Sequence, residues 1–199
     1  MRRELTTSLL AVVVFTLLLG VAYPVGVWAV GQVAFPRKAG GSLVQVHGRL
    51  VGSSLIGQDF SAGKRAAAYL QSRPSQDRYD AAATFFSNRG PNQASAVAFY
   101  KRQLAAYVKR ERPYDPGLTA AQVPVDAVTT SASGVDPHVS KANALIQAHR
   151  IAAVRHLSLA RVTQLIAQHT DGRFAGFLGE PGVNVLELNI ALDKEAPIA

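Results

Sequence analysis

The 199-residue sequence contains no cysteine. This absence excludes a disulfide scaffold, a thiolate zinc site and a cysteine nucleophile. Acidic residues are also scarce, since 13 Asp and Glu stand against 21 Lys and Arg. With 17% charged and 48% hydrophobic residues, the chain is too apolar for a disordered protein. Its length suits one ordinary domain with a small additional segment.

Charged residues are missing altogether between Leu5 and Pro36. A bilayer core of roughly 30 Å needs about 20 helical residues, so this stretch predicts a transmembrane helix over residues 7–34 after a short tail over 1–6. A cleaved signal peptide is the alternative, but its apolar region would run only about 7 to 15 residues. We therefore expect a retained single-pass anchor. Arg2 and Arg3 on one flank and Arg37 and Lys38 on the other leave its orientation undecided.

One half of this predicted helix contains small residues, which make it narrower. Gly20, Gly26 and Gly31 lie there, together with Pro24, which removes a backbone donor and favours a kink. Small residues allow close helix packing in lipid, so this half is a candidate contact with another membrane protein. A frayed interfacial end is an equally open reading.

Residues 40–199 show no repeat and no second linker, which predicts one compact domain. Its pattern indicates an α+β fold with more helix than strand. A hairpin is expected at 43–46 and 49–51, joined by His47-Gly48. Segment 183–193 fits either a strand or a helix. Helices are predicted over 61–71, from an Asn92 cap to 109, from a Ser140 cap to 156, and from a Ser158 cap to 169; a turn is predicted over 87–91.

The predicted helix ending at 109 carries an apolar stripe and a basic far end. A solvated face that complements the helix dipole is favoured over an anion-binding patch. No run of five like charges and no nucleic-acid motif occurs, so nucleic acid is not an expected partner. The stripe is Val97, Tyr100, Leu104 and Val108; the cations are Lys101, Arg102, Lys109, Arg110 and Arg112.

Two sequence features resemble catalytic motifs and fail their templates. Gly57–Arg65 resembles a phosphate loop, but its glycines enclose five residues and Arg65 stands where a magnesium-binding hydroxyl belongs. No Asp-Lys-Thr-Gly-Thr phosphorylation sequence occurs, so ATP hydrolysis would belong to a partner.

The residue types of a serine hydrolase also occur together within residues 131–140. Triad members normally come from distant segments, so helix capping by these serines and aspartate is favoured. A membrane-anchored hydrolase using Ser133, Asp136 and His138 is kept as the alternative function. The histidines of the following helix have no acidic partner at metal-binding spacing, and no metal site is expected.

Gln147 and Arg150 lie one turn apart on a predicted helix. Their amide and guanidinium could converge on a carboxylate or a phosphate. On residue type alone, a solvated polar face is favoured. The carboxylates Asp126, Asp136, Glu180, Glu187 and Asp193 are scattered along the chain.

Several motifs, in order along the chain, resemble the KdpC family, the C subunit of Kdp potassium-transporting ATPases. The most distinctive stretch is 124–140, which contains Ser133, Gly134, Asp136, Pro137, His138 and Ser140. The C-terminal block 183–189 contains Asn184 and Asn189. The other matching segments are 52–60, 73–75, 87–91 and 178–180.

The resemblance implies a non-catalytic subunit of a four-subunit complex in the cell inner (plasma) membrane. Its partners would be a channel-like potassium-binding subunit, a P-type ATPase subunit and a small single-helix subunit. No cofactor of its own is implied; ATP would act through the pump subunit, whose ATP affinity this subunit would raise as a catalytic chaperone, with Gln147 and Arg150 at the matching positions. The family arrangement also implies that domain 40–199 is extracytoplasmic, where ATP should not be available. The assembly role is therefore preferred to direct nucleotide binding.

Overall fold

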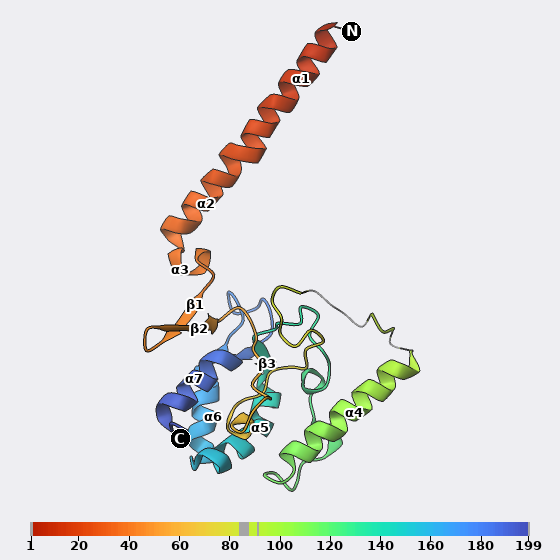
Figure 1. The fold of residues 1–199 in the computed structure, drawn as a ribbon, viewed down its shortest axis with the longest axis vertical. Coiled ribbons are helices and arrows are strands. Elements are labelled where there is room, and N and C mark those ends of the chain that lie inside the picture. The colour runs from red at the N-terminus through yellow and green to blue at the C-terminus, as the bar shows by residue number, and fades with distance from the viewer. Residues whose placement is uncertain (1, 84–87, 91, 199) are drawn as a thin grey trace.

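The computed structural model describes residues 2–83, 88–90 and 92–198, and it shows a long helix followed by one α+β domain (Figure 1). Helix exceeds strand, as predicted. The elements in chain order are α1 (Arg2–Leu17), the π-helical turn η1 (Leu18–Ala22), α2 (Tyr23–Ala34), α3 (Pro36–Ala39), β1 (Leu43–Val46), β2 (Arg49–Ser53), the 3₁₀ turn η2 (Ala66–Ala68), α4 (Ala94–Glu111), the 3₁₀ turns η3 (Ala120–Gln122) and η4 (Val125–Ala127), β3 (His138–Ser140), α5 (Lys141–Arg155), α6 (Leu159–Gln168), β4 (Thr170–Asp171), β5 (Gly182–Asn184) and α7 (Val185–Glu195).

The first three elements form one continuous rod, Arg2–Ala34, which we call the anchor helix. Among the described residues it is the single helix that is long and apolar enough to cross a bilayer. At 1.5 Å per residue its 33 residues span about 50 Å, so the helix exceeds the hydrocarbon core and leaves room for tilt. The helix already begins at Arg2, within the segment expected as a tail.

A π-helical turn accommodates Pro24 within the anchor helix. In a regular α-helix the Pro24 ring would press against the carbonyl of Gly20, four residues earlier. Here the preceding residue, Tyr23, donates its N–H to the Leu18 carbonyl, five residues back. We attribute the widened turn to Pro24, because it lets the helix continue through the proline.

The predicted hairpin is confirmed. β1 and β2 pair antiparallel, with Val46 opposite Arg49. His47 and Gly48 both have positive φ, 50° and 75°, the backbone that a tight two-residue hairpin turn requires.

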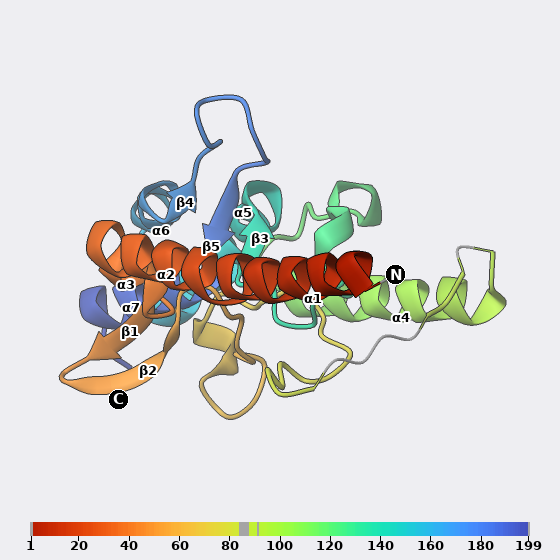
Figure 2. The same ribbon diagram turned by 90° about the horizontal axis from the view of Figure 1, so that it is seen from above.

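The core lies where α5, α6 and α7 pack against a three-stranded antiparallel sheet of order β3-β5-β4. Figure 2, in which the anchor helix runs across the view, shows this sheet beside α5 and α6. Fully burying a Leu, Ile or Val side chain stabilises the fold by about 1.5–3 kcal/mol, so the burial of this cluster favours folding. Its fully buried members include Ile151, Val162, Ile166, Val183, Leu188 and Leu192.

Side-chain caps fix where the core helices begin. Ser140 accepts from the N–H of Asn143 at the start of α5, and Ser158 does the same for α6, as predicted. The ambiguous segment 183–193 contains both structures, because Asn184 ends β5 and caps α7.

The predicted helix over 61–71 is wrong. The segment forms only the short turn η2, and by Tyr69 the backbone is extended. Local propensity favoured helix, but side chains of α5 and α7 take the hydrogen bonds that a helix would have used, as described below.

Helix α4 also differs in detail from the prediction. It begins after Gln93, without a side-chain cap from Asn92. The expected apolar stripe does not face the core, because Val97 and Tyr100 are 45% and 40% exposed. Tyr107 and Glu111 are the residues buried near its C-terminal end, and Figure 1 shows the rest of α4 extending away from the body. Of the predicted turn at 87–91, Ser87 and Pro91 lie outside the described residues.

Candidate functional site

A stretch of chain, residues 67–71, that is buried at Ala68, Leu70 and Gln71 is held by polar side chains from α5 and α7. We call it the clamped segment. Each of its five carbonyl oxygens accepts a hydrogen bond from a side chain, in place of the bonds a helix would supply. The side chains that make these bonds are Gln147, Arg150, Arg155 and Asn189.

Gln147 binds both backbone polar groups of Gln71, the last residue of the clamped segment. Its Oε1 accepts from the N–H of Gln71 at 2.8 Å, and its Nε2 donates to the carbonyl of Gln71 at 3.2 Å. The same amide accepts from Arg150 Nη2 at 2.8 Å and donates to Asn143 Oδ1 at 2.9 Å. An amide offers two donors and two acceptor lone pairs, so all its hydrogen-bonding capacity is used within the chain.

Asn189 on α7 repeats this arrangement one residue earlier. Its Oδ1 accepts from the N–H of Leu70 at 2.8 Å, and its Nδ2 donates to the Leu70 carbonyl at 3.0 Å. Both amides therefore pair with backbone as a neighbouring strand would. Leu70 is fully buried, so its peptide groups need these partners.

Arg150 forms a buried ion pair with Glu111 at the end of α4. Its Nε lies 3.0 Å from Glu111 Oε2 and 3.2 Å from Oε1, while Nη1 donates to the carbonyls of Ala67 and Tyr69. Burial lowers the pKa of the Arg150 guanidinium, and the Glu111 carboxylate opposes that change. The expectation of a solvated polar face is wrong, because Arg150 and Gln147 are each only 1% exposed. Only Arg150 binds a carboxylate, that of Glu111 in this same chain, while the Gln147 amide accepts from Arg150 and binds the Gln71 backbone.

Arg155 closes the clamp near the C-terminus. Its Nε donates to the Ala68 carbonyl at 2.7 Å and its Nη2 to Asp193 Oδ1 at 2.7 Å, while its guanidinium stacks 4.9 Å from the centre of the Tyr69 ring. The Tyr69 hydroxyl donates to Asp193 at 3.0 Å. Burial, with Asp193 nearby, raises the pKa of Tyr69.

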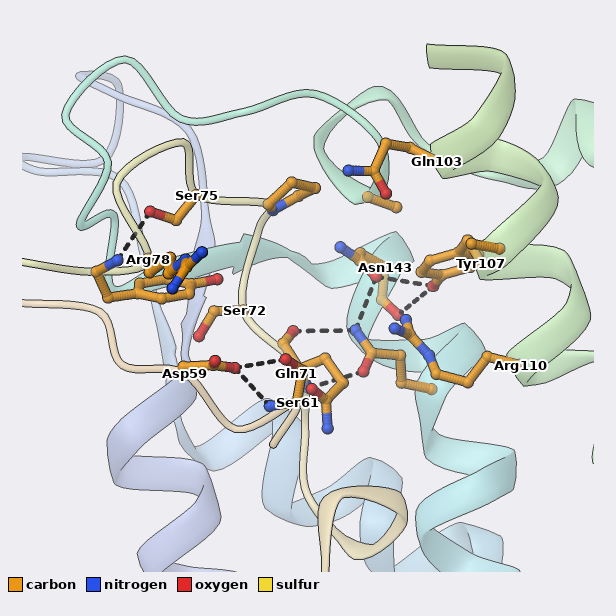
Figure 3. A pocket seen from close by; sticks show the side chains of 15 residues that line it. Asp59, Ser61, Gln71, Ser72, Ser75, Arg78, Gln103, Tyr107, Arg110 and Asn143 are labelled. Atoms are coloured by element: carbon orange, nitrogen blue, oxygen red, sulfur yellow. Dashed lines mark hydrogen bonds between the residues drawn. The ribbon is translucent and has the colours of Figure 1, made fainter. Parts of the chain in front are cut away.

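A polar cleft of about 290 Å³ opens over the clamped segment, between α4, α5 and the loop around residue 75 (Figure 3). Gln147 lies in its wall, and Asn143 accepts there from the Tyr107 hydroxyl at 2.8 Å. Burial raises the pKa of Tyr107, with Glu111 adding to the effect. Arg78 and Arg110 also line the cleft together with Asp59, and Arg110 Nε is paired with Glu111 Oε1 at 2.6 Å.

The structure ties the three hydrolase candidates to separate partners. Asp136 accepts from its neighbour's backbone, the N–H of His138, at 2.9 Å and from Arg73 Nη1 at 2.9 Å. The His138 ring lies 2.8 Å from Asp171 Oδ2 instead. Ser133 Oγ accepts from the N–H of Val135 at 3.2 Å. These contacts do not join a serine to a histidine base, as a hydrolase would need.

The rest of the distinctive stretch organises the start of α5. The Pro137 carbonyl accepts from the N–H of Val185 at 2.9 Å, which connects β3 to α7. Asp126 accepts from the N–H and hydroxyl of Ser140, both at 2.8 Å, and from Asn143 at 3.0 Å. The sequence did not predict this role for Asp126, because no local pattern links it to the Ser140 cap, 14 residues away.

The glycines of the anchor helix have open surroundings. A Cβ added at Gly26 would meet nothing within 4 Å, and at Gly20 or Gly31 it would make only an ordinary contact of 3.9 Å. Any constraint on Gly26 must therefore come from outside the described chain. In the described part of the chain, no three His, Asp or Glu side chains gather as metal ligands.

Comparison with known proteins gives a consistent result. Residues 5–194 match the family model described as KdpC, K⁺-transporting ATPase, c chain. A potassium-transporting ATPase KdpC subunit of Mycobacterium bovis BCG is 46% identical over 197 residues, covering 98% of this chain and all of the relative. The subunit of the same name from Methylococcus capsulatus is 48% identical over 189 residues, covering 94% and 95%. That from Methylibium petroleiphilum is 48% identical over 200 residues, covering 99% and 100%.

Proposed function

This chain belongs to the KdpC family of K⁺-transporting ATPase subunits, and from that premise we propose that it is a non-catalytic accessory subunit that stabilises an ATP-driven potassium uptake complex. The observation that carries the proposal is the use of its polar residues. Gln147 and Arg150 could have formed a binding site. They instead form hydrogen bonds and an ion pair within the domain. A domain whose buried polar side chains bind its own backbone, carried on a membrane helix, suits a scaffold.

The partners would be the channel-like potassium-binding subunit, the P-type ATPase subunit and the small single-helix subunit. We expect contact through the glycine-containing half of the anchor helix and through domain 40–199, placed on the extracytoplasmic side. Deleting this chain should abolish recovery of the intact complex and its high-affinity uptake of potassium. Unchanged ATP-driven uptake by a complex lacking it would contradict the proposal.

Orientation is tested by cysteine labelling, since the natural chain has none. Ala98 and Ala153 are exposed and lie within helices, so Ala98→Cys and Ala153→Cys should react with a membrane-impermeant thiol reagent in intact cells. Arg3→Cys, at the opposite end of the anchor helix, is the control that should react only after lysis. The reverse pattern would place the domain in the cytoplasm.

An effect on ATP affinity would then be exerted through contact with the pump subunit. Direct nucleotide binding by Gln147 would require its amide to give up bonds to Gln71, Asn143 or Arg150. Gln147→Glu should therefore weaken the domain itself together with any change in the ATP KM of the complex. A raised KM with unchanged domain stability would instead favour direct contact.

A further inference from the structure

The loop between β4 and β5 exposes three large apolar side chains. Phe174, Phe177 and Leu178 are 78%, 70% and 51% exposed, although they lie within five residues of one another. Exposed apolar side chains gathered this closely on a soluble domain usually mark an interaction surface. We call Phe174–Leu178 the apolar loop.

The backbone of the apolar loop holds these side chains outward. Phe174 donates its N–H to the Leu178 carbonyl at 2.8 Å, and Leu178 donates to the Phe174 carbonyl at 2.9 Å. Ala175 and Gly176 have positive φ, 52° and 83°, which closes a tight turn between them. The exposure is therefore a property of a defined turn.

The apolar loop lies beside the exit of the anchor helix. Phe174 lines one surface hollow together with Arg37 and Lys38, which follow the helix directly, and with Leu55, which is itself 59% exposed. Figure 1 shows this part of the chain at the end of the domain that faces the helix, and Figure 2 shows it projecting sideways from the helix. A bilayer around the helix would thus lie next to the loop.

We propose that the apolar loop inserts into the interfacial layer of the bilayer that holds the anchor helix. The uncharged run ends at Pro36, so Arg37 and Lys38 lie at the level of the lipid headgroups. Phe174 shares their hollow and reaches the same level. Apolar side chains flanked by cations bind such interfaces, particularly those with anionic lipids.

Charges around the loop are compatible with this placement. Arg173 beside it pairs with Glu180 at 3.1 Å, and the Asp171 carboxylate lies 2.8 Å from the His138 ring. The loop would give the domain a second attachment, which limits rotation about the single helix. The inference rests on the anchor helix spanning a membrane, and it holds for either orientation of the domain.

The test places a fluorophore on Phe177→Cys in the full chain, reconstituted in nanodiscs of phosphatidylcholine and phosphatidylglycerol. Lipids carrying a nitroxide near the headgroup should quench it about twofold more than a fluorophore on Tyr100→Cys, on the exposed face of α4. Leu178→Cys retains both phenylalanines and should give the same result. It is included because replacing Phe177 could itself remove the insertion.

Equal quenching at the loop and at Tyr100→Cys would overturn the proposal. The same measurement in the assembled complex decides between lipid and protein as the occupant. Quenching that persists there supports the bilayer. A fluorophore that is screened from nitroxide lipids only in the complex would show that another subunit covers the loop, and would overturn the proposal.

Discussion

Gln147 on α5 and Asn189 on α7 form hydrogen bonds to the backbone of two consecutive residues. Gln147 exchanges two hydrogen bonds with Gln71, and Asn189 exchanges two with Leu70. The two amides thus supply from side chains the ladder that a neighbouring strand would supply from backbone. From Tyr69 on, the clamped segment can therefore be buried while extended, because its polar groups are satisfied.

Replacing Gln147 by leucine should destabilise the chain strongly. Gln147→Leu leaves the N–H and carbonyl of Gln71 buried without partners, and each lost partner costs about 1–3 kcal/mol, so we expect a loss of about 2–6 kcal/mol in the free energy of unfolding. Pulse proteolysis in urea, with the full chain in detergent micelles, measures it. Gln164→Leu, at an exposed position of α6, should change stability by less than about 0.5 kcal/mol. Equal stability of the two variants would refute the clamp.

Removing both members of the buried ion pair should cost less than the two single losses added together. Glu111→Met leaves the Arg150 guanidinium buried without its carboxylate, at about 3–5 kcal/mol. The double variant Glu111→Met/Arg150→Met should be more stable than the sum of the single effects predicts, by about 0.5–3 kcal/mol. Unfolding in urea measures all three. Glu195→Met, which breaks an exposed pair with Arg161, is the control and should have no measurable effect.

Alanine at Gly134 should not fit. The residue has φ of 74°, and an added Cβ would lie 2.2 Å from Asp77 Oδ2. Strain of this kind costs about 1–3 kcal/mol, so Gly134→Ala should lower the urea midpoint clearly. Gly172 has no atom within 4 Å of an added Cβ, and Gly172→Ala should leave the midpoint unchanged or raise it slightly. Similar midpoints for both variants would contradict the packing described.

Stability should decline at alkaline pH. Burial raises the pKa of Tyr79 to about 12, and the Asp59 carboxylate adds to it. In the unfolded chain a tyrosine loses its proton near pH 10, so between about 10 and about 12 only the unfolded state ionises and the free energy of unfolding falls with rising pH. Urea midpoints across this range should fall less steeply in Tyr79→Phe than in the natural chain. Tyr100→Phe is the control, and a slope equal in both variants would count against the assignment.

Leucine at Gly26 should impair assembly without disturbing the chain. Because a side chain there meets nothing of the chain itself, Gly26→Leu should leave the folded domain intact while it blocks close approach of a partner helix. Co-purification of the other subunits with the tagged chain measures the loss. Val27→Leu, one residue further along, keeps a branched apolar side chain and should assemble normally. Full assembly of Gly26→Leu would remove this helix face as the partner contact.

The sequence by itself determined the features whose cause is local. An uncharged run longer than a bilayer core gives the anchor helix, His47-Gly48 gives the hairpin turn, and Ser140 and Ser158 cap their helices through residues three positions away. Each is decided by spacing or by backbone preference within a few residues.

Only the tertiary structure decided the clamped segment and the state of the polar residues around it. A stretch with helical propensity forms only the short turn η2 and is extended from Tyr69, because Gln147 and Asn189, 76 and 119 residues away from the peptide groups they bind, satisfy its backbone. The same contacts bury Gln147 and Arg150, whose residue types favoured a solvated face. Propensities amount to less than about 1 kcal/mol per residue, whereas an unpaired buried peptide group costs about 1–3 kcal/mol, so the long-range partners prevail.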